Sequence, residues 1–278
     1  MNKVYCSIEE RYVNPLFEVF DGGDFILSSY RDIEEKLTQV RIYFPEAERT
    51  DEAKKCLGAA LEIVGVSAPI EVAQIPDEDW KLAYRRHFKT ERIGRRIVVH
   101  PPWEPMPTDG VVITLDPGMA FGTGKHETTR ACLEFIDELS DERGSFLDMG
   151  CGSGILSIAA AKLGFSPVCG FDVDQEAVNA SVENAAGNGV AVEYFKYGLG
   201  AKIRRELPKA DLVAANILGP LLIRFAAEIV PCVRKRLIIS GILTELYPEV
   251  LKAYEAQGLK EVARKTFGEW TTGLLVRV

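Results

Sequence analysis

The stretch from Phe146 to Leu156, FLDMGCGSGIL, decides the fold class of this chain. An apolar, strand-like run enters a turn with glycines at positions 150, 152 and 154 and continues directly into a helical pattern. Glycine accepts backbone dihedrals that a Cβ atom would forbid, and it lets the backbone pass close to a ligand. The first turn of the following helix offers backbone N–H groups without intrahelical partners. The stretch therefore predicts a strand–turn–helix unit with a ligand at the turn.

The spacing of these glycines separates two classes of ligand. A dinucleotide-binding turn reads G-x-G-x-x-G, and its third glycine seats a pyrophosphate. Here Ile155 occupies that third position, and the pattern is D-x-G-x-G-x-G instead. This pattern suits the amino-acid half of S-adenosylmethionine, which carries no phosphate. We therefore interpret the turn, with Gly150 and Gly152, as a site for S-adenosylmethionine, and we disfavour a dehydrogenase.

Outward from this turn, residues 108–278 alternate between apolar strand-like runs and helical patterns. The strand-like runs are 145–149, 168–172, 191–195, 211–216 and 237–240, and the helical patterns are 153–163, 174–187, 219–231 and 244–257. Such alternation favours an α/β fold with a mostly parallel sheet, here of seven strands, covered by helices on both faces. The stretches Lys260–Thr266 and Glu269–Val278, joined at Gly268, predict an antiparallel hairpin at the end of that sheet.

The first 75 residues predict a small α+β domain. Strand-like stretches occur at Lys3–Ser7, Phe25–Ser29 and Gln39–Phe44, and a helical pattern runs from Thr50 to Val64. Residues 76–107 form the predicted connector. It comprises a helix near 77–87, a strand at 96–100 and a proline-rich extended stretch. We therefore expect three parts, at 1–75, 76–107 and 108–278.

Two polar residues close apolar strands of the predicted sheet. Asp172 follows the second strand, 18 residues after Gly154, where a carboxylate can accept both ribose hydroxyls of a nucleoside. Asp174 is interpreted as the N-cap of the next helix. Asn216 ends the fourth strand, and ligands of open α/β sheets bind outside the carboxyl ends of strands. Its carboxamide could orient an amine; the alternative is that Asn216 caps the helix beginning near Gly219.

The segment 115–129, LDPGMAFGTGKHETT, is a glycine-rich loop that leads into a helix. A phosphate-binding loop is excluded, because that motif needs glycine at position 119 and a hydroxyl at 126, where Met119 and His126 stand. The loop could close over a ligand, with Phe121 covering it or presenting a ring face to a sulfonium cation. We expect His126 to be a capping or solvated residue rather than a base.

Composition limits the classes of function. The chain has 278 residues, 47% of them hydrophobic, and a formal net charge of −8. Residues 1–75 alone hold 14 acidic and 8 basic side chains. This asymmetry indicates either a solvated acidic face or a surface for a basic protein partner, and direct nucleic-acid binding is the least favoured. Scattered cysteines, no C-x-x-C pair, no signal peptide and no apolar span predict a cytoplasmic protein without a metal site.

Together, LDPGMAFGTGKHETT, DMGCGSGILSIAA, FDVD and ANIL resemble the PrmA family, the methyltransferases of large-subunit ribosomal protein L-eleven (L11). The glycine turn alone is typical of any class I methyltransferase. The loop AFGTG-x-H-x-TT together with ANIL narrows the resemblance to this family. The resemblance covers roughly residues 111–278 and extends, less specifically, to the connector and the small first domain.

The resemblance implies a class I, Rossmann-like methyltransferase domain preceded by a substrate-recognition domain. It implies S-adenosylmethionine as methyl donor, and trimethylation of lysine side chains and of the N-terminal amine of the ribosomal protein. Carried over by motif, the donor-binding residues are Thr129, Gly150, Asp172 and Asn216, with Asn216 also at the reacting amine. We expect a monomer. Two other functions stay open, namely methylation of an exocyclic amine of RNA or DNA and a non-catalytic binding module in ribosome assembly.

Overall fold

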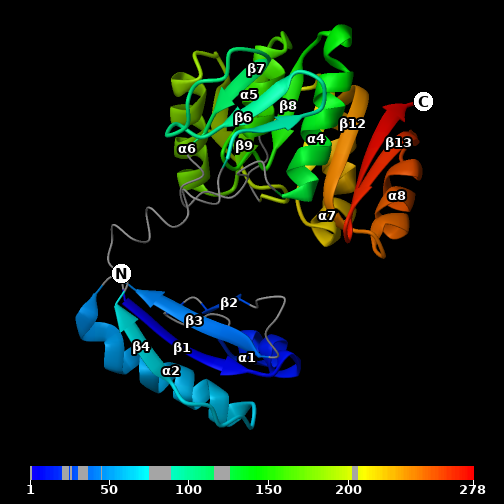
Figure 1. The fold of residues 1–278 in the computed structure, drawn as a ribbon. Helices are drawn as coiled ribbons and strands as arrows, with labels where there is room; N and C mark the ends of the chain where they lie inside the picture. Colours follow the sequence, from blue (N-terminus) through cyan, green and yellow to red (C-terminus); the bar gives the residue numbers. More distant parts are fainter. Residues whose placement is uncertain are drawn as a thin grey trace. The chain divides into compact units, whose positions relative to one another are not determined.

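The computed structural model of the chain describes residues 2–20, 25, 27–30, 37–44, 46–74, 89–115, 126–201 and 206–278. Its contacts divide the chain into two units, Met1–His87 and Phe88–Val278, each with a core of its own (Figure 1). Residues 89–107, predicted as part of a connector, lie in the second unit, because Ile93 and Ile97 are buried in its core. The helix predicted near 77–87 lies outside the described residues.

The first unit is a four-stranded antiparallel sheet with two helices on one face. Its elements are β1 (Asn2–Ile8), α1 (Val13–Phe20), β2 (Leu27–Tyr30), β3 (Thr38–Phe44), α2 (Thr50–Ile63) and β4 (Glu71–Gln74). The strand order is β2-β3-β1-β4, and all its pairs are antiparallel. This β-α-β-β-α-β arrangement is the ferredoxin-like motif. The predicted α+β class is thereby confirmed, and α1 and β4 are additions to it.

Alternation along the strands explains why both helices pack on the same face. In β1, Val4 and Cys6 are buried against the helices, whereas Lys3 and Tyr5, which alternate with them, lie on the open face. Successive residues of a strand point to opposite faces, so one sheet face is apolar and the other is polar. Helix α2 contributes an apolar stripe of four buried residues, which are Ala53, Leu57, Ala60 and Leu61.

The second unit is built on a seven-stranded sheet in the order β10-β9-β8-β11-β12-β14-β13. The strands are β8 (Phe146–Met149), β9 (Val168–Asp172), β10 (Glu193–Lys196), β11 (Ala210–Asn216), β12 (Val233–Leu243), β13 (Leu259–Phe267) and β14 (Trp270–Arg277). The first five strands in this order pair in parallel, and β14 is antiparallel to both of its neighbours, β12 and β13. The predicted mostly parallel sheet with a C-terminal hairpin is confirmed.

Helices cover both faces of this sheet (Figure 1). They are α4 (Glu127–Glu138), α5 (Ile155–Lys162), α6 (Gln175–Gly187), α7 (Gly219–Ile229) and α8 (Tyr247–Glu255). Neighbouring strand residues divide between two cores: Ala214 packs with α4 and α5, and Ala215 packs with α7 and α8. Among the described residues, no helix is long and apolar enough to cross a membrane.

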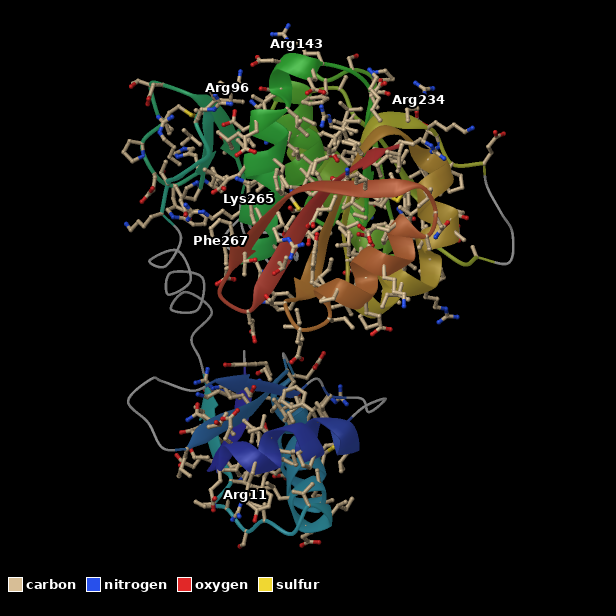
Figure 2. The ribbon with its side chains drawn as sticks, turned by 90° about the vertical axis from the view of Figure 1, so that its right-hand side faces the viewer. Arg11, Arg96, Arg143, Arg234, Lys265 and Phe267 are labelled. Carbon is tan, nitrogen blue, oxygen red and sulfur yellow. The ribbon has the colours of Figure 1, made fainter. Side chains whose placement is uncertain are left out.

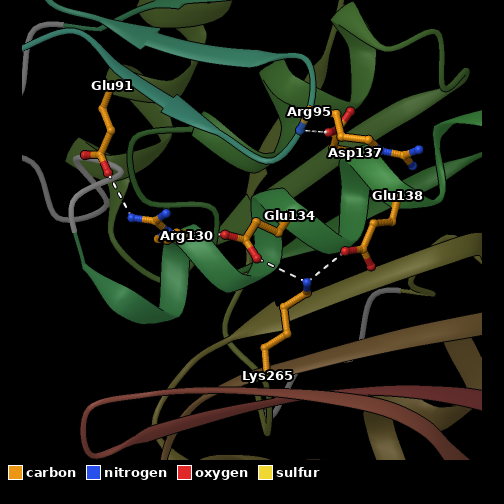
Figure 3. Close-up of polar contacts among 7 residues, drawn as sticks. All are labelled: Glu91, Arg95, Arg130, Glu134, Asp137, Glu138 and Lys265. Atoms are coloured by element: carbon orange, nitrogen blue, oxygen red, sulfur yellow. Dashed lines mark hydrogen bonds and ion pairs between the residues drawn. The ribbon is translucent and has the colours of Figure 1, made fainter.

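A small second sheet packs against α4 and α5. It consists of β5 (Glu91–Ile93), β6 (Ile97–His100) and β7 (Val111–Thr114). The carboxylate of Asp137, near the end of α4, accepts hydrogen bonds from the backbone N–H of Arg95 (2.6 Å) and from N–H and Nε of Arg96 (3.2 and 2.8 Å). Burial opposes the charge of Asp137, but these bonds outweigh it and lower its pKa. The carboxylate thus anchors the β5–β6 turn to α4 (Figure 3).

Ion pairs extend along the exposed side of α4. Arg130 bridges Glu91 of β5 (3.1 Å) and Glu134 of its own helix (3.2 Å). Lys265 of β13 pairs with Glu134 (3.1 Å) and Glu138 (2.8 Å) (Figure 3). Lys265 and Phe267, two residues apart on β13, both point toward α4 (Figure 2). Helix α4 is therefore tied to the small sheet on one side and to the C-terminal hairpin on the other.

We expect Asp137→Ala to lower the free energy of unfolding by about 2 kcal/mol, because three donors lose one buried charged acceptor. Glu138→Ala, one residue along, removes a solvent-exposed ion pair and should stay within about 0.5 kcal/mol of the wild type. Urea unfolding followed by circular dichroism measures both. Equal losses in the two variants would contradict the anchoring role of Asp137.

Candidate functional site

The strand order of the large sheet reverses between β8 and β11, because the chain leaves β8 toward β9 on one side and later returns to β11 on the other. Open α/β sheets bind ligands outside the carboxyl ends of strands at such a switch point. Gly150 follows β8 directly, and Asp172 and Asn216 are the last residues of β9 and β11. Three of the predicted site residues therefore lie along one edge of the sheet.

The glycine turn between β8 and α5 has the left-handed backbone predicted for it. The φ angles of Gly150, Gly152 and Gly154 are 74°, 52° and 79°. A Cβ atom on Gly150 would lie 2.6 Å from Cγ2 of Ile217, and one on Gly154 would lie 2.6 Å from the Tyr194 hydroxyl. Glycine is needed at both positions by the packing of neighbouring protein atoms as well as by the backbone conformation.

Asp148, two residues before the turn, is fully buried. Its Oδ2 accepts hydrogen bonds from the backbone N–H (3.1 Å) and the hydroxyl (2.6 Å) of Ser157 in α5, and its Oδ1 has no partner among the residues that the structure describes. Burial raises the pKa of Asp148 to about 6, against the bonds from Ser157, and the charge of Asp172 adds to the rise. An unpartnered carboxylate oxygen is costly in a protein interior. The residue fits a ligand that brings a positive charge to the turn.

Asp172 joins the glycine turn to the start of α6. Its Oδ2 accepts from the N–H of Gly152 and its Oδ1 from the N–H of Asp174, both at 3.0 Å. Each carboxylate oxygen can accept a further hydrogen bond, so the half-buried group can still bind two hydroxyls. Asp174 is the N-cap of α6, with its carboxylate accepting from the N–H of Glu176 at 3.0 Å, which confirms the capping prediction.

Asn216 contacts the first turn of α4. Its Nδ2 donates to Oγ1 of the buried Thr129 at 3.5 Å. The N-cap of α7 is Leu218, which makes no side-chain capping bond, so the alternative of Asn216 as a helix cap is wrong. Because Nδ2 is turned to Thr129, the carboxamide oxygen of Asn216 is left to accept a hydrogen bond from another group. Thr129 and Asn216, far apart in sequence, are thus brought together.

His126 is the N-cap of α4. Its Nδ1 lies 2.8 Å from the hydroxyl of Thr128 and 3.4 Å from the N–H of the same residue, which confirms the capping prediction. Its ring meets that of Trp270 edge-on, with centroids 5.0 Å apart. Trp270 was not predicted as a site residue, because only the sheet pairing brings β14 here. Phe121 lies outside the described residues.

Ile217, the residue after Asn216, is enclosed by two glycines. Besides the approach of Gly150, a Cβ atom on Gly241 of β12 would lie 2.5 Å from the Ile217 carbonyl oxygen. Gly241 has a φ of 81° and lies where the register between β12 and β14 shifts. Within the described residues, no three His, Cys, Asp or Glu side chains gather as metal ligands would. The arrangement is suited to holding a cationic nucleoside ligand beside an amine-orienting amide.

Comparison with known proteins identifies relatives that match most of the chain. A family model described as ribosomal protein L11 methyltransferase (PrmA) matches residues 16–277. A protein of that name from Geobacter sulfurreducens is 44% identical over 246 residues, covering 84% of this chain and 79% of the relative. One from a Thermoanaerobacter species is 35% identical over 264 residues, covering 91% and 84%.

A solved structure supports the same relationship. The crystal structure of a ribosomal protein L11 methylase from Lactobacillus delbrueckii superposes with a TM-score of 0.62 at 30% identity. The superposition covers 68% of this chain and 99% of that one. With a family model matched over nearly the whole length and relatives above 30% identity across most of it, the chain belongs to the ribosomal protein L11 methyltransferase family.

Proposed function

We propose that this chain transfers methyl groups from S-adenosylmethionine to lysine side chains and the N-terminal amine of ribosomal protein L11. The observation that carries the proposal is the meeting of Asn216 with Thr129 at the sheet edge that also holds the glycine turn. The turn and Asp172 suit a nucleoside ligand without phosphate, and the amide suits an amine. The names of the relatives supply the protein that bears the amine.

The donor would be held by groups from four segments. Asp172 accepts the ribose hydroxyls, and Gly150 and Gly152 let the backbone approach the amino-acid half. The Oδ1 atom of Asp148, which has no partner among the described residues, would accept a hydrogen bond from the ammonium group of the donor. Thr129, which follows the glycine-rich loop, would lie beside the end of the donor that carries the methyl group. Phe121, in that loop, would cover the bound donor. When bound, S-adenosylmethionine supplies a methyl group on a positively charged sulfur.

Asn216 would orient the acceptor amine through its carboxamide oxygen. A lysine ammonium has no lone pair and a solution pKa of about 10.4, so it must lose a proton first. A pocket of low polarity lowers that pKa, and water can take the proton, so no dedicated base is required. The chain then contributes mainly by positioning, which can supply several kcal/mol.

The acidic first domain, residues 1–75, would hold the basic ribosomal protein. The part of the predicted connector that precedes the second unit, Phe88–Val278, would let that unit reach several amines. A monomer in the cytoplasm, without direct contact to nucleic acid or membrane, completes the proposal. Support comes from the uneven charge and the scattered cysteines of the sequence.

Asp172→Ala should weaken donor binding by about 2 kcal/mol, because the ribose hydroxyls lose a charged acceptor. Asp174→Ala is the matched control, since that carboxylate bonds to the N–H of Glu176 and caps α6. It should lower stability and leave the dissociation constant nearly unchanged. Isothermal titration calorimetry measures both. A donor affinity unchanged in Asp172→Ala would remove this residue from the ribose site.

Donor affinity should fall as pH drops through about 6, because protonation of Asp148 removes the charge that the ammonium group requires. The direction of the pH effect follows from the form of Asp148 that binds the donor. Because the ionised carboxylate binds the ammonium group, donor affinity is highest above the pKa of Asp148 and weakens below it. Asp148→Asn should bind weakly at every pH and show no such step. Calorimetric titrations from one pH unit below this value to one above it decide the point. A step that persists in Asp148→Asn would assign it to another group.

The proposal as a whole is tested by intact-mass spectrometry of L11 incubated with the chain and donor. The full chain should add mass in increments of one CH₂ group. A fragment of residues 88–278, which has its own core, should bind the donor equally well and methylate L11 more slowly. Equal rates for fragment and full chain would contradict recognition by the first domain, and no added mass would contradict L11 as substrate.

A further inference from the structure

Two buried hydroxyl groups, those of Ser240 and Thr272, lie between α4 and the strands β12 and β14, next to the contact between Thr129 and Asn216. Ser240 of β12 is fully buried, and Thr272 of β14 is 1% exposed. The hydroxyl of Ser240 lies 3.2 Å from the carbonyl oxygen of Thr128 and 2.6 Å from the hydroxyl of Thr272. Ser240 interrupts the apolar run Leu237–Leu243, where an aliphatic side chain would carry no cost of burying a polar group.

The direction of these hydrogen bonds follows from the number of protons. A carbonyl oxygen can only accept, so Ser240 must donate its single proton to Thr128. Thr272 then donates to Ser240, which accepts through its lone pairs. The two hydrogen bonds therefore connect β14, through Ser240 of β12, to the first turn of α4.

Ser240 adjoins both partners of the Thr129–Asn216 contact. In the parallel pairing of β11 with β12, Asn216 is directly opposite Ser240. Thr128, whose carbonyl Ser240 holds, immediately precedes Thr129 in the first turn of α4. Ser240 is therefore linked to Asn216 through the sheet and to Thr129 through a hydrogen bond.

The contact between Thr129 and Asn216 is too long to hold itself in place. At 3.5 Å it lies at the outer limit of a hydrogen bond, where the interaction is weak. Their separation must therefore be set by the backbone around them. On the β11 side Gly150 and Gly241 enclose Ile217, and on the α4 side the hydroxyls of Ser240 and Thr272 hold the carbonyl of Thr128.

We propose that Ser240 and Thr272 are positioning residues for methyl transfer, which fix the first turn of α4 so that the Thr129 hydroxyl stays against the Asn216 carboxamide. The inference rests on the proposed function, because it assigns the purpose of a geometry that function requires. Both residues are almost completely buried, and both would act through the carbonyl group of Thr128. A displacement of about 1 Å at a reacting centre can reduce a rate by about a hundredfold.

The test compares two adjacent threonines of β14. Thr271 is also 1% exposed, but its hydroxyl bonds to Thr244 (2.9 Å) and Thr266 (3.0 Å), not to α4. Valine replaces one hydroxyl by a methyl group of similar size in either case. We expect Thr272→Val to lower kcat on L11 about tenfold or more, with the donor dissociation constant changed less than about threefold. Thr271→Val should keep kcat near wild type at a similar loss of thermal stability, and Thr272→Ser should restore it.

A second readout is independent of catalysis. The side-chain amide signals of Asn216 in an ¹⁵N-correlated NMR spectrum of the full chain should shift in Thr272→Val and stay in place in Thr271→Val. Equal losses of kcat in the two valine variants, or an unmoved Asn216 signal in Thr272→Val, would overturn the positioning role. A wild-type chain that leaves L11 unmodified would overturn the proposed function instead, and the NMR comparison would still decide the inference.

Discussion

The catalytic edge of the large sheet depends on the close fit around Ile217. Its side chain approaches Gly150 of the glycine turn, and its carbonyl approaches Gly241 of β12, in both cases where a Cβ atom would collide. The turns after β8 and β11 and the strand β12 thereby pack against one another at this residue. Asn216, one residue earlier, receives its position from this fit, because steric exclusion is far stiffer than a hydrogen bond of 3.5 Å.

Hydrophobic patterning predicted the central strands of the large sheet well, but it predicted strand ends and short strands poorly. The runs at 168–171 and 212–215 are apolar, as is typical of strands that are buried on both faces. β12 runs from Val233 to Leu243 and is longer than the predicted 237–240, because it also includes the charged residues 234–236 and the residues after Ser240, where pairing with β11 and β14 supports the strand conformation. The short strands β4, β5 and β7 were missed for a similar reason: three or four residues carry too little periodicity, and tertiary pairing decides their conformation.

The residues of the candidate site fall into the same two groups: some could be predicted from the sequence pattern, and others depend on tertiary packing. Gly150, Asp172 and Asn216 could be placed from sequence because each directly follows or ends a strand, and parallel strands bring their carboxyl ends to one edge. The pairing of Asn216 with Thr129 required knowledge of how α4 packs. Asp148 stood in the quoted glycine motif, but its burial and its unpartnered oxygen are consequences of the folded core. Ser240 and Thr272 carry no motif at all, and only the pairing of β12 with β14 brings them together.

The insertion of β14 between β12 and β13 sets an order of events during translation. The glycine turn and both ends of the Thr129–Asn216 contact are synthesised well before β14, the last strand of the chain. Until β14 emerges, Ser240 lacks the donor that Thr272 provides, and β12 is an unprotected sheet edge. The hydrogen bond between Ser240 and Thr272 therefore forms only after nearly the whole second unit has been synthesised.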